Sequence, residues 1–176
     1  MDTAQALRKL WGPVGQIGYV VRDVDAATKQ WTDSIGVGPW HIFDPAPFDV
    51  LRYEGEPTDA EVTIALGFMG EVQIELIQQN NDEPSMYREV LDTYGEGVQH
   101  ICFYPDDYDA AIEAGLAAGM TMAQDGRIWG IDFAYLRGEG GRVIELGRLD
   151  EKGQARRRAG IEAAAAWDGS DPFRRH

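Results

Sequence analysis

The segment GQIGYVVRDVDAA, residues 15–27, carries the pattern that decides the fold of this chain. Its first half alternates between two faces as a β-strand does, and Asp23 can then cap a helix whose apolar residues follow helical spacing. A second segment, VQHICFYPDDYDAA at residues 98–111, aligns with it without a gap and places His100 under Gln16. The two segments indicate an internal repeat with an offset of 84 residues, 100 minus 16.

A second pair of segments follows in the same order. VQIELIQQ at residues 72–79 and RVIELGR at 142–148 each place one glutamate between isoleucine and leucine. Their offset is 70, or 145 minus 75, so the first half carries 14 more residues between its landmarks than the second (84 minus 70). We expect the extra length in HIFDPAPFDVLRYEGEPTDAE, residues 41–61. Two pairs in one order indicate a duplicated module.

Each half is predicted to form a strand, a helix and several further strands. The fold class is therefore α+β. Module 1 spans residues 13–80, a connecting helix spans 82–95, and module 2 spans 97–149 within one domain of residues 1–149. Residues 150–176 are expected to form a helical tail.

Composition limits the classes of partner. The net charge of −14 argues against nucleic acid and against anionic membrane surfaces, because both require clustered basic residues. The basic run at Arg156–Arg158 is the exception, and it is read as a solvated helix face or, alternatively, as an anion site. No segment has the length of a membrane span or the form of a secretory signal, so a cytoplasmic location is expected. Cys102 is the single cysteine and is expected in the core.

The two repeated glutamates point to a site. Strand alternation turns Ile74 and Leu76 toward the helix and Glu75 toward the opposite, concave face, and Glu145 repeats this arrangement. A carboxylate on such a face must be paired, hydrated or bound to a cation, although each alone could be an ordinary exposed residue. If the modules pack as copies, Gln16, Glu75, His100 and Glu145 come from corresponding strands and can converge.

These segments resemble the vicinal oxygen chelate superfamily, which includes glyoxalase I, methylmalonyl-CoA epimerase, extradiol dioxygenases and bleomycin-resistance proteins. The likeness covers about residues 13–149. It implies an α+β fold of two βαβββ modules in tandem, whose curved mixed sheet cups a divalent metal, with ligands at the positions of Gln16, Glu75, His100 and Glu145. A homodimer is expected from the same resemblance.

The ligand set limits the metal. One imidazole, two carboxylates and one amide oxygen suit Zn, Co, Ni, Mn or Mg. Non-haem iron oxygenases use two histidines and a carboxylate, and His41 has no partner at the equivalent position of the repeat. Extradiol oxygenation is therefore disfavoured.

The expected reaction is removal of a proton next to a carbonyl, with Glu145 as the first candidate base and Glu75 as the second. The substrate would be an acyl-CoA, another thioester or an α-hydroxycarbonyl compound. Epimerases of the family typically begin with histidine where this chain has Gln16, and Thr63, or Glu61 on the same face, stands where some carry a further catalytic glutamate. A glyoxalase I-type lactoylglutathione lyase is the first alternative. The second is a binding protein without chemistry, whose pocket would be lined by aromatic residues: Trp40, Phe43, Tyr53, Trp129, Phe133 and Tyr135.

Overall fold

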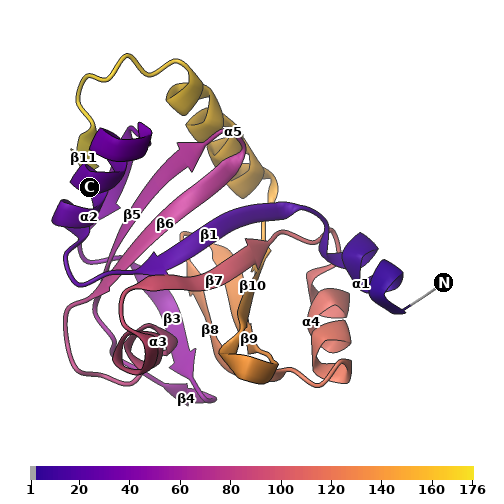
Figure 1. The fold of residues 1–176 in the computed structure, drawn as a ribbon. Coiled ribbons are helices and arrows are strands. Elements are labelled where there is room, and N and C mark those ends of the chain that lie inside the picture. Colours follow the sequence, from indigo (N-terminus) through magenta and orange to yellow (C-terminus); the bar gives the residue numbers. More distant parts are fainter. Residues whose placement is uncertain (1–2) are drawn as a thin grey trace.

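A strongly curved sheet organises the computed structural model, which describes residues 3–176 as a mixed α+β fold (Figure 1). Its strands are β1 (Val14–Val20), β2 (Trp40–Phe43), β3 (Phe48–Tyr53), β4 (Glu56–Pro57), β5 (Val62–Met69), β6 (Val72–Gln79), β7 (Gly97–Phe103), β8 (Thr121–Ile128), β9 (Ile131–Arg137), β10 (Val143–Arg148) and β11 (Phe173–Arg175). The helices are α1 (Thr3–Trp11), α2 (Val24–Ile35), α3 (Met86–Tyr94), α4 (Tyr108–Ala117) and α5 (Glu151–Ala165), with a short 3-10 turn, η1 (Glu139–Gly141).

Strand order confirms the duplicated module. The first half of the sheet runs β2-β5-β6-β1 and the second runs β7-β10-β9-β8, so each half pairs its first strand with its last. Both of these pairings are parallel. Glu75 lies opposite Gly18 across one of them, and Glu145 lies opposite Cys102 across the other. Gly18 and Cys102 are 84 residues apart, which is the offset of the repeat.

The two halves join through β1 and β7, which run antiparallel and side by side across the middle of the sheet (Figure 1). Ile17 pairs with Ile101, its own counterpart in the repeat. On either side, Gln16 pairs with Cys102 and Gly18 pairs with His100. These pairs are exchanged by the repeat, so an approximate two-fold axis passes between Ile17 and Ile101.

Helices cover the outer face of each half, as the apolar pattern predicts. Asp23 caps α2 through the N–H of Ala26, and Gly36 ends it in the left-handed conformation. Ile74 and Leu76 of β6 pack with Val24 of α2. In the second half, Leu146 of β10 packs with Ala111 of α4, and Ile144 lies against the same cluster. The odd-numbered residues of β6 and β10 therefore face the concave side.

The extra length of the first half forms β3 and β4, which lie within residues 41–61. β3 crosses to the other module and pairs antiparallel with β8. On the concave side, residues from both modules and from α3 form one apolar cluster, which includes Val20, Ile77, Tyr87, Tyr135 and Val143. The insertion and α3 therefore tie the modules together beyond the central β1–β7 joint.

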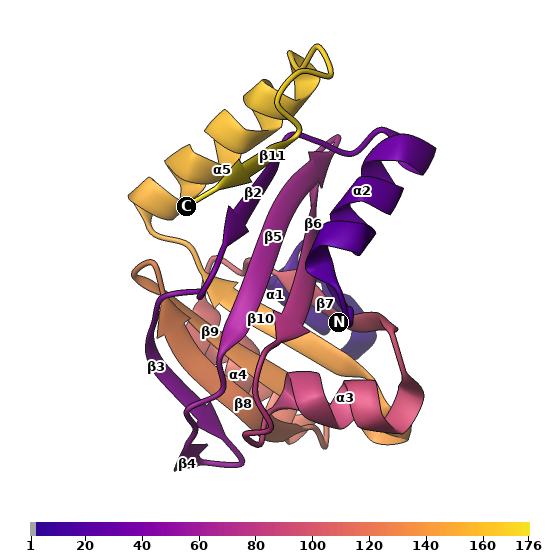
Figure 2. The same cartoon turned by 90° about the vertical axis from the view of Figure 1, so that its left-hand side faces the viewer.

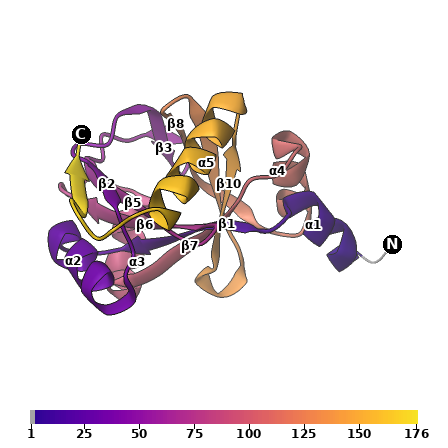
Figure 3. The same ribbon diagram turned by 90° about the horizontal axis from the view of Figure 1, so that it is seen from above.

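The C-terminal segment is helical over α5 and then forms β11, a strand that the sequence analysis did not predict. α5 runs beside β5, and β11 adds to the edge of the sheet next to β2 (Figure 2). Seen from above, β11 and α1 lie on opposite sides of the molecule (Figure 3). Among residues 3–176, no helix combines the length and the apolar character that crossing a membrane requires.

Candidate metal centre

Four strands meet at the centre of the concave face, and each contributes one polar side chain. Gln16 comes from β1, Glu75 from β6, His100 from β7 and Glu145 from β10. Gln16, Glu75 and His100 are buried, and Glu145 is the most exposed of the four. The structure therefore brings together all four residues that the sequence analysis selected, one from the first and one from the last strand of each module.

The imidazole of His100 lies at the centre of this group. Its Nε2 is 2.9 Å from Oε2 of Glu145, 3.5 Å from Oε2 of Glu75 and 3.2 Å from Oε1 of Gln16. One potential ligand atom from each of Glu75, His100 and Glu145 can be chosen so that all lie within 4.8 Å of one another. Three oxygens therefore converge on a single ring nitrogen.

Gly18 makes room for the imidazole. A Cβ atom added to Gly18 would lie 2.0 Å from Cε1 of His100, far inside the distance that two carbon atoms tolerate. The counterpart of Gly18 across the two-fold axis is Cys102, a buried residue that pairs with Gln16. Position 18 of β1 must therefore be glycine, because the imidazole of His100, from β7, occupies the space that a side chain would need.

Two further glutamines hold the side chains at the centre. Nε2 of Gln16 donates to Oε1 of Gln73 at 3.0 Å, which leaves the amide oxygen of Gln16 facing His100. On the other side, Nδ1 of His100 lies 2.5 Å from Oε1 of Gln99. The sequence analysis missed both glutamines. Gln73 could have been found, because it shares the concave face with Glu75 at a spacing of two residues.

The neighbouring charges change the proton affinities of the site. Burial is the main cause that raises the pKa of Glu75, to about 7, and the charge of Glu145 adds to it, while His100 opposes it. For His100, burial lowers the pKa, but the carboxylates of Glu145 and Glu75 outweigh it, and the pKa is raised. Tyr135, whose ring centroid lies 5.0 Å from that of His100, has its pKa raised by burial and by Glu145. Its hydroxyl stays protonated at neutral pH.

The donor set fits a divalent cation. His100 Nε2 can offer one hydrogen, yet three oxygen atoms surround it. Oε2 of Glu145 is buried and has no hydrogen-bond donor aligned with it. Two carboxylates at such short separation repel each other unless a proton or a cation lies between them. Oxygen and imidazole nitrogen are the ligands that Zn, Co, Ni, Mn and Mg accept.

Other candidates from the sequence lie away from this centre. Thr63 points to the opposite face of the sheet, where it donates to Asp44 at 2.9 Å and accepts from Asn80. Glu61, two residues earlier, has the same parity and is exposed, so the expectation that either could serve in the cup is wrong. His41 lies in β2, next to the edge strand β11, and its Nδ1 is 2.9 Å from Nε2 of His176.

The predicted aromatic lining is only partly present. Phe133 and Tyr135 belong to the concave cluster, and Tyr53 and Trp129 pack against it. Phe43 packs on Trp129, with ring centroids 4.7 Å apart. Trp40 is fully buried under α2 on the other face, so its assignment to the pocket is wrong. It was assigned from residue type alone, without the parity of its strand.

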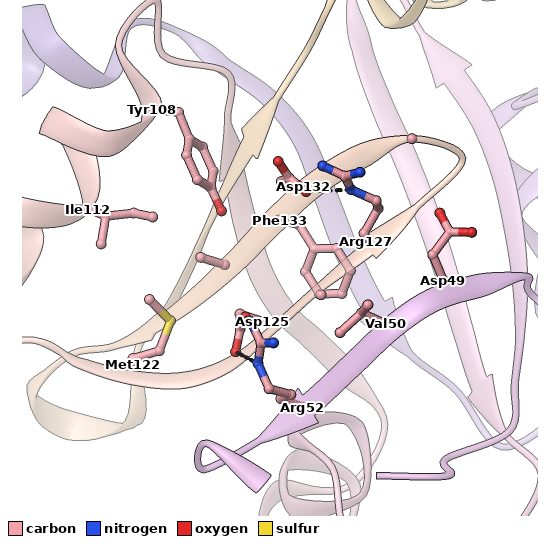
Figure 4. Close-up of a pocket in the computed structure, with 13 residues that line it drawn as sticks. Asp49, Val50, Arg52, Tyr108, Ile112, Met122, Asp125, Arg127, Asp132 and Phe133 are labelled. Atoms are coloured by element: carbon pink, nitrogen blue, oxygen red, sulfur yellow. Dashed lines mark hydrogen bonds and ion pairs between the residues drawn. The ribbon is translucent and has the colours of Figure 1, made fainter. Parts of the chain in front are cut away.

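A groove of about 710 Å³ lies beside α4 and is lined by residues of β3, β8 and β9 as well (Figure 4). Tyr108 and Ile112 line it from α4, and Ala134 lines it from β9. Four of its charged residues form ion pairs, Arg52 with Asp125 and Arg127 with Asp132, and Asp49 lines it as well. None of the four residues at the metal centre is among those that line this groove, so it is a separate surface.

Comparisons with known proteins identify the family and the fold. Residues 15–135 match the model of the glyoxalase/bleomycin resistance protein/dioxygenase superfamily. The fold is similar to that of methylmalonyl-CoA epimerase from Mycobacterium tuberculosis, with a TM-score of 0.61 and 21% identity over 84% of this chain and 94% of that chain.

Two ligand complexes are similar as well. A variant of the Streptomyces coelicolor epimerase in complex with 2-nitronate-propionyl-CoA has a TM-score of 0.57 and 19% identity, over 77% of this chain and 95% of that one. A methylmalonyl-CoA epimerase in complex with methylmalonyl-CoA and NH4+ has a TM-score of 0.56 and 19% identity, over 78% and 94%. Among curated protein sequences, none matches this chain.

Proposed function

Because this chain belongs to the glyoxalase/bleomycin resistance protein/dioxygenase superfamily, we propose that it is a metal-dependent isomerase or epimerase that removes a proton α to a carbonyl. The observation that carries the proposal is the pair of carboxylates, Glu75 and Glu145, on either side of the buried His100. Solved structures of similar fold that hold acyl-CoA compounds support an acyl-CoA or a related thioester as the substrate class.

The metal would be held by Gln16, Glu75, His100 and Glu145, whose oxygen and nitrogen atoms converge at the centre of the sheet. A divalent cation bound there would polarise the substrate carbonyl and stabilise the negative charge that develops on its oxygen. Gln73 keeps the amide oxygen of Gln16 turned toward the centre. Tyr135 and the surrounding apolar cluster exclude water from one side of the site.

Glu145 is the first candidate for the base. Its side chain is 12% exposed, against 10% for Glu75 and 0% for His100, and its Oε2 lies 2.9 Å from Nε2 of His100 at the centre of the site. Glu75 comes from the equivalent position of the other module, on the far side of the two-fold axis. Two carboxylates in this relation suit epimerisation, because one can take the proton from one face of the substrate while the other returns it to the opposite face.

The test begins with metal analysis of the purified protein. The metal-loaded protein is then incubated in D2O with branched and unbranched acyl-CoAs and, separately, with hemithioacetals of glutathione. We expect deuterium at the α carbon of an acyl-CoA. Conversion of a hemithioacetal alone would support a glyoxalase-type lyase instead. Tight binding of the metal with no exchange in any substrate would support a binding protein without chemistry. The expected homodimer is tested on the same sample by sedimentation.

A further inference from the structure

A β-bulge in β7 places Gln99 beside the metal centre. Gly18 of β1 pairs with His100, and the next residue, Tyr19, pairs with Val98, so Gln99 is left without a partner in the β1–β7 ladder. In a regular strand, Gln99 and His100 would point to opposite faces. The bulge lets both side chains be buried and brings Oε1 of Gln99 within 2.5 Å of Nδ1 of His100.

We propose that Gln99 is a positioning residue that fixes the tautomer and the orientation of His100, so that Nε2 is the nitrogen presented to the metal. A neutral imidazole carries one hydrogen, and a hydrogen held on Nδ1 by an acceptor leaves the lone pair on Nε2. Nε2 is also the nitrogen on which the oxygens of Gln16, Glu75 and Glu145 converge. This inference rests on the proposed metal site and adds a residue to it.

The surroundings of Gln99 support this role. Its Oε1 faces His100, while its Nε2 is buried and has no hydrogen-bond partner within residues 3–176. An amide used only for packing or for satisfying its own groups would have its donor paired. In Gln99 the amide oxygen faces His100, whereas the amide N–H group has no partner in the part of the chain that the structure describes. This arrangement is explained if the site requires an oxygen against Nδ1 of His100.

The repeat does not supply this residue. With an offset of 84, the counterpart of Gln99 is Gly15, which has no side chain to support Gln16. Gln16 is held instead by Gln73, from the neighbouring β6. An amide ligand needs its oxygen oriented, whereas an imidazole ligand needs its second nitrogen protonated. The different partners match these different needs.

The experiment compares Gln99→Leu with Gln99→Glu. Leucine has a similar size and no acceptor, so zinc affinity should fall about 10- to 100-fold, as for other residues that support a metal ligand. Glutamate restores an acceptor for the Nδ1 proton and should recover most of the affinity. Gln78→Leu is the matched control, because Gln78 is a glutamine of the same sheet that accepts from the N–H of Val24 on the other face. Its affinity should match that of the parent.

The second readout is independent of activity. Nitrogen-15 NMR of His100 in the zinc-loaded protein should show zinc on Nε2 and a slowly exchanging hydrogen on Nδ1, and Gln99→Leu should lose the slow exchange. The proposal is overturned if folded Gln99→Leu keeps both that hydrogen and the parent affinity. If the parent binds no zinc or cobalt, the proposed function fails. The slowly exchanging Nδ1 hydrogen of the metal-free protein would then still report whether Gln99 orients the ring.

Discussion

The two halves of the site share a backbone and differ in chemistry. Glu75 and Glu145 occupy equivalent positions of the last strands, but the first strands contribute an amide at Gln16 and an imidazole at His100. The difference spreads into the surroundings, because the imidazole requires Gly18 opposite it and Gln99 beside it. Symmetry therefore sets where the side chains meet, and the departures from symmetry set what each of them does.

The largest expected effect comes from removing the two first-strand residues one at a time. His100→Ala should lower affinity for zinc or cobalt by more than the ~100-fold that marks the upper end for supporting residues, because it removes the only nitrogen ligand. Gln16→Ala should cost less, since a neutral amide oxygen is a weaker ligand. Titration with each metal measures the difference, and circular dichroism checks the fold. Equal losses in the two variants, or a folded His100→Ala that holds metal like the parent, would contradict the comparison.

The two glutamates are separated by a kinetic test. Glu145→Gln can keep metal through its amide oxygen but cannot accept a proton, so exchange of the substrate α proton in D2O should fall by at least ~10²-fold. Glu75→Gln should show a milder loss. Both are measured at matched metal occupancy with the substrate found in the screen. Full exchange in Glu145→Gln with none in Glu75→Gln would reverse the two roles.

A steric test compares Gly18 with Cys102, its equivalent across the two-fold axis. Gly18→Ala forces a carbon atom to within 2.0 Å of the His100 ring, so the ring or the strand must move. We expect a loss of about 1–3 kcal/mol in the free energy of unfolding, as for other overpacked cores, together with weaker metal binding. Cys102→Ala, at the equivalent position, removes only one sulfur atom and should leave metal affinity unchanged. Urea unfolding of both variants gives the comparison, and a Gly18→Ala protein as stable as Cys102→Ala would refute it.

A further test concerns the pH dependence of stability in the metal-stripped protein. Folding raises the pKa of Glu75 from 4.5 to about 7 and also raises that of His100, so the folded protein binds these protons more tightly than the unfolded chain does. Their contribution to stability is fully present below the unfolded pKa values and is lost as pH rises through the folded ones, at up to about 1.4 kcal/mol per pH unit for each proton. Thermal unfolding between pH 5 and 8 (about the range spanned by these groups) should show decreasing stability.

Substitution identifies the group responsible. Glu75→Gln should flatten this dependence, because the amide does not titrate in this range. A metal-free parent that becomes more stable as pH rises across the same interval would show that the carboxyl of Glu75 is already ionised in the folded state.

The meeting of four side chains could be predicted from sequence because it depends only on strand alternation and on the repeat. Both are local or periodic signals, and Glu75 and Glu145 carry them clearly. The role of Gln99 depends on a β-bulge, which turns one residue to the other face of the sheet. The amino-acid sequence carries no signal that would predict this bulge. For Thr63, the error came from assigning a face by family likeness. Its neighbours Val62 and Ile64 are the residues of β5 that face the concave cluster.

Long-range pairing was likewise beyond the sequence. β3 of the first module pairs with β8 of the second. β11 pairs with β2, although more than half of the chain separates them in sequence. These pairings join short segments whose composition is compatible with loops as well as strands. Their partners are selected by the shape of the finished sheet, in which β2 and β8 are the strands left open at the edges of the two modules.

The axis between Ile17 and Ile101 also bears on the history of the molecule. Two identical half-length chains could associate through the same joint and build one cup between them, but such a pair must place the same residue on both sides. Fusion into a single chain removes that constraint. Only then can one copy keep an imidazole while the other carries an amide, and only then can glycine face histidine across the joint. Linking the two halves covalently is what allows each half of the site to specialise.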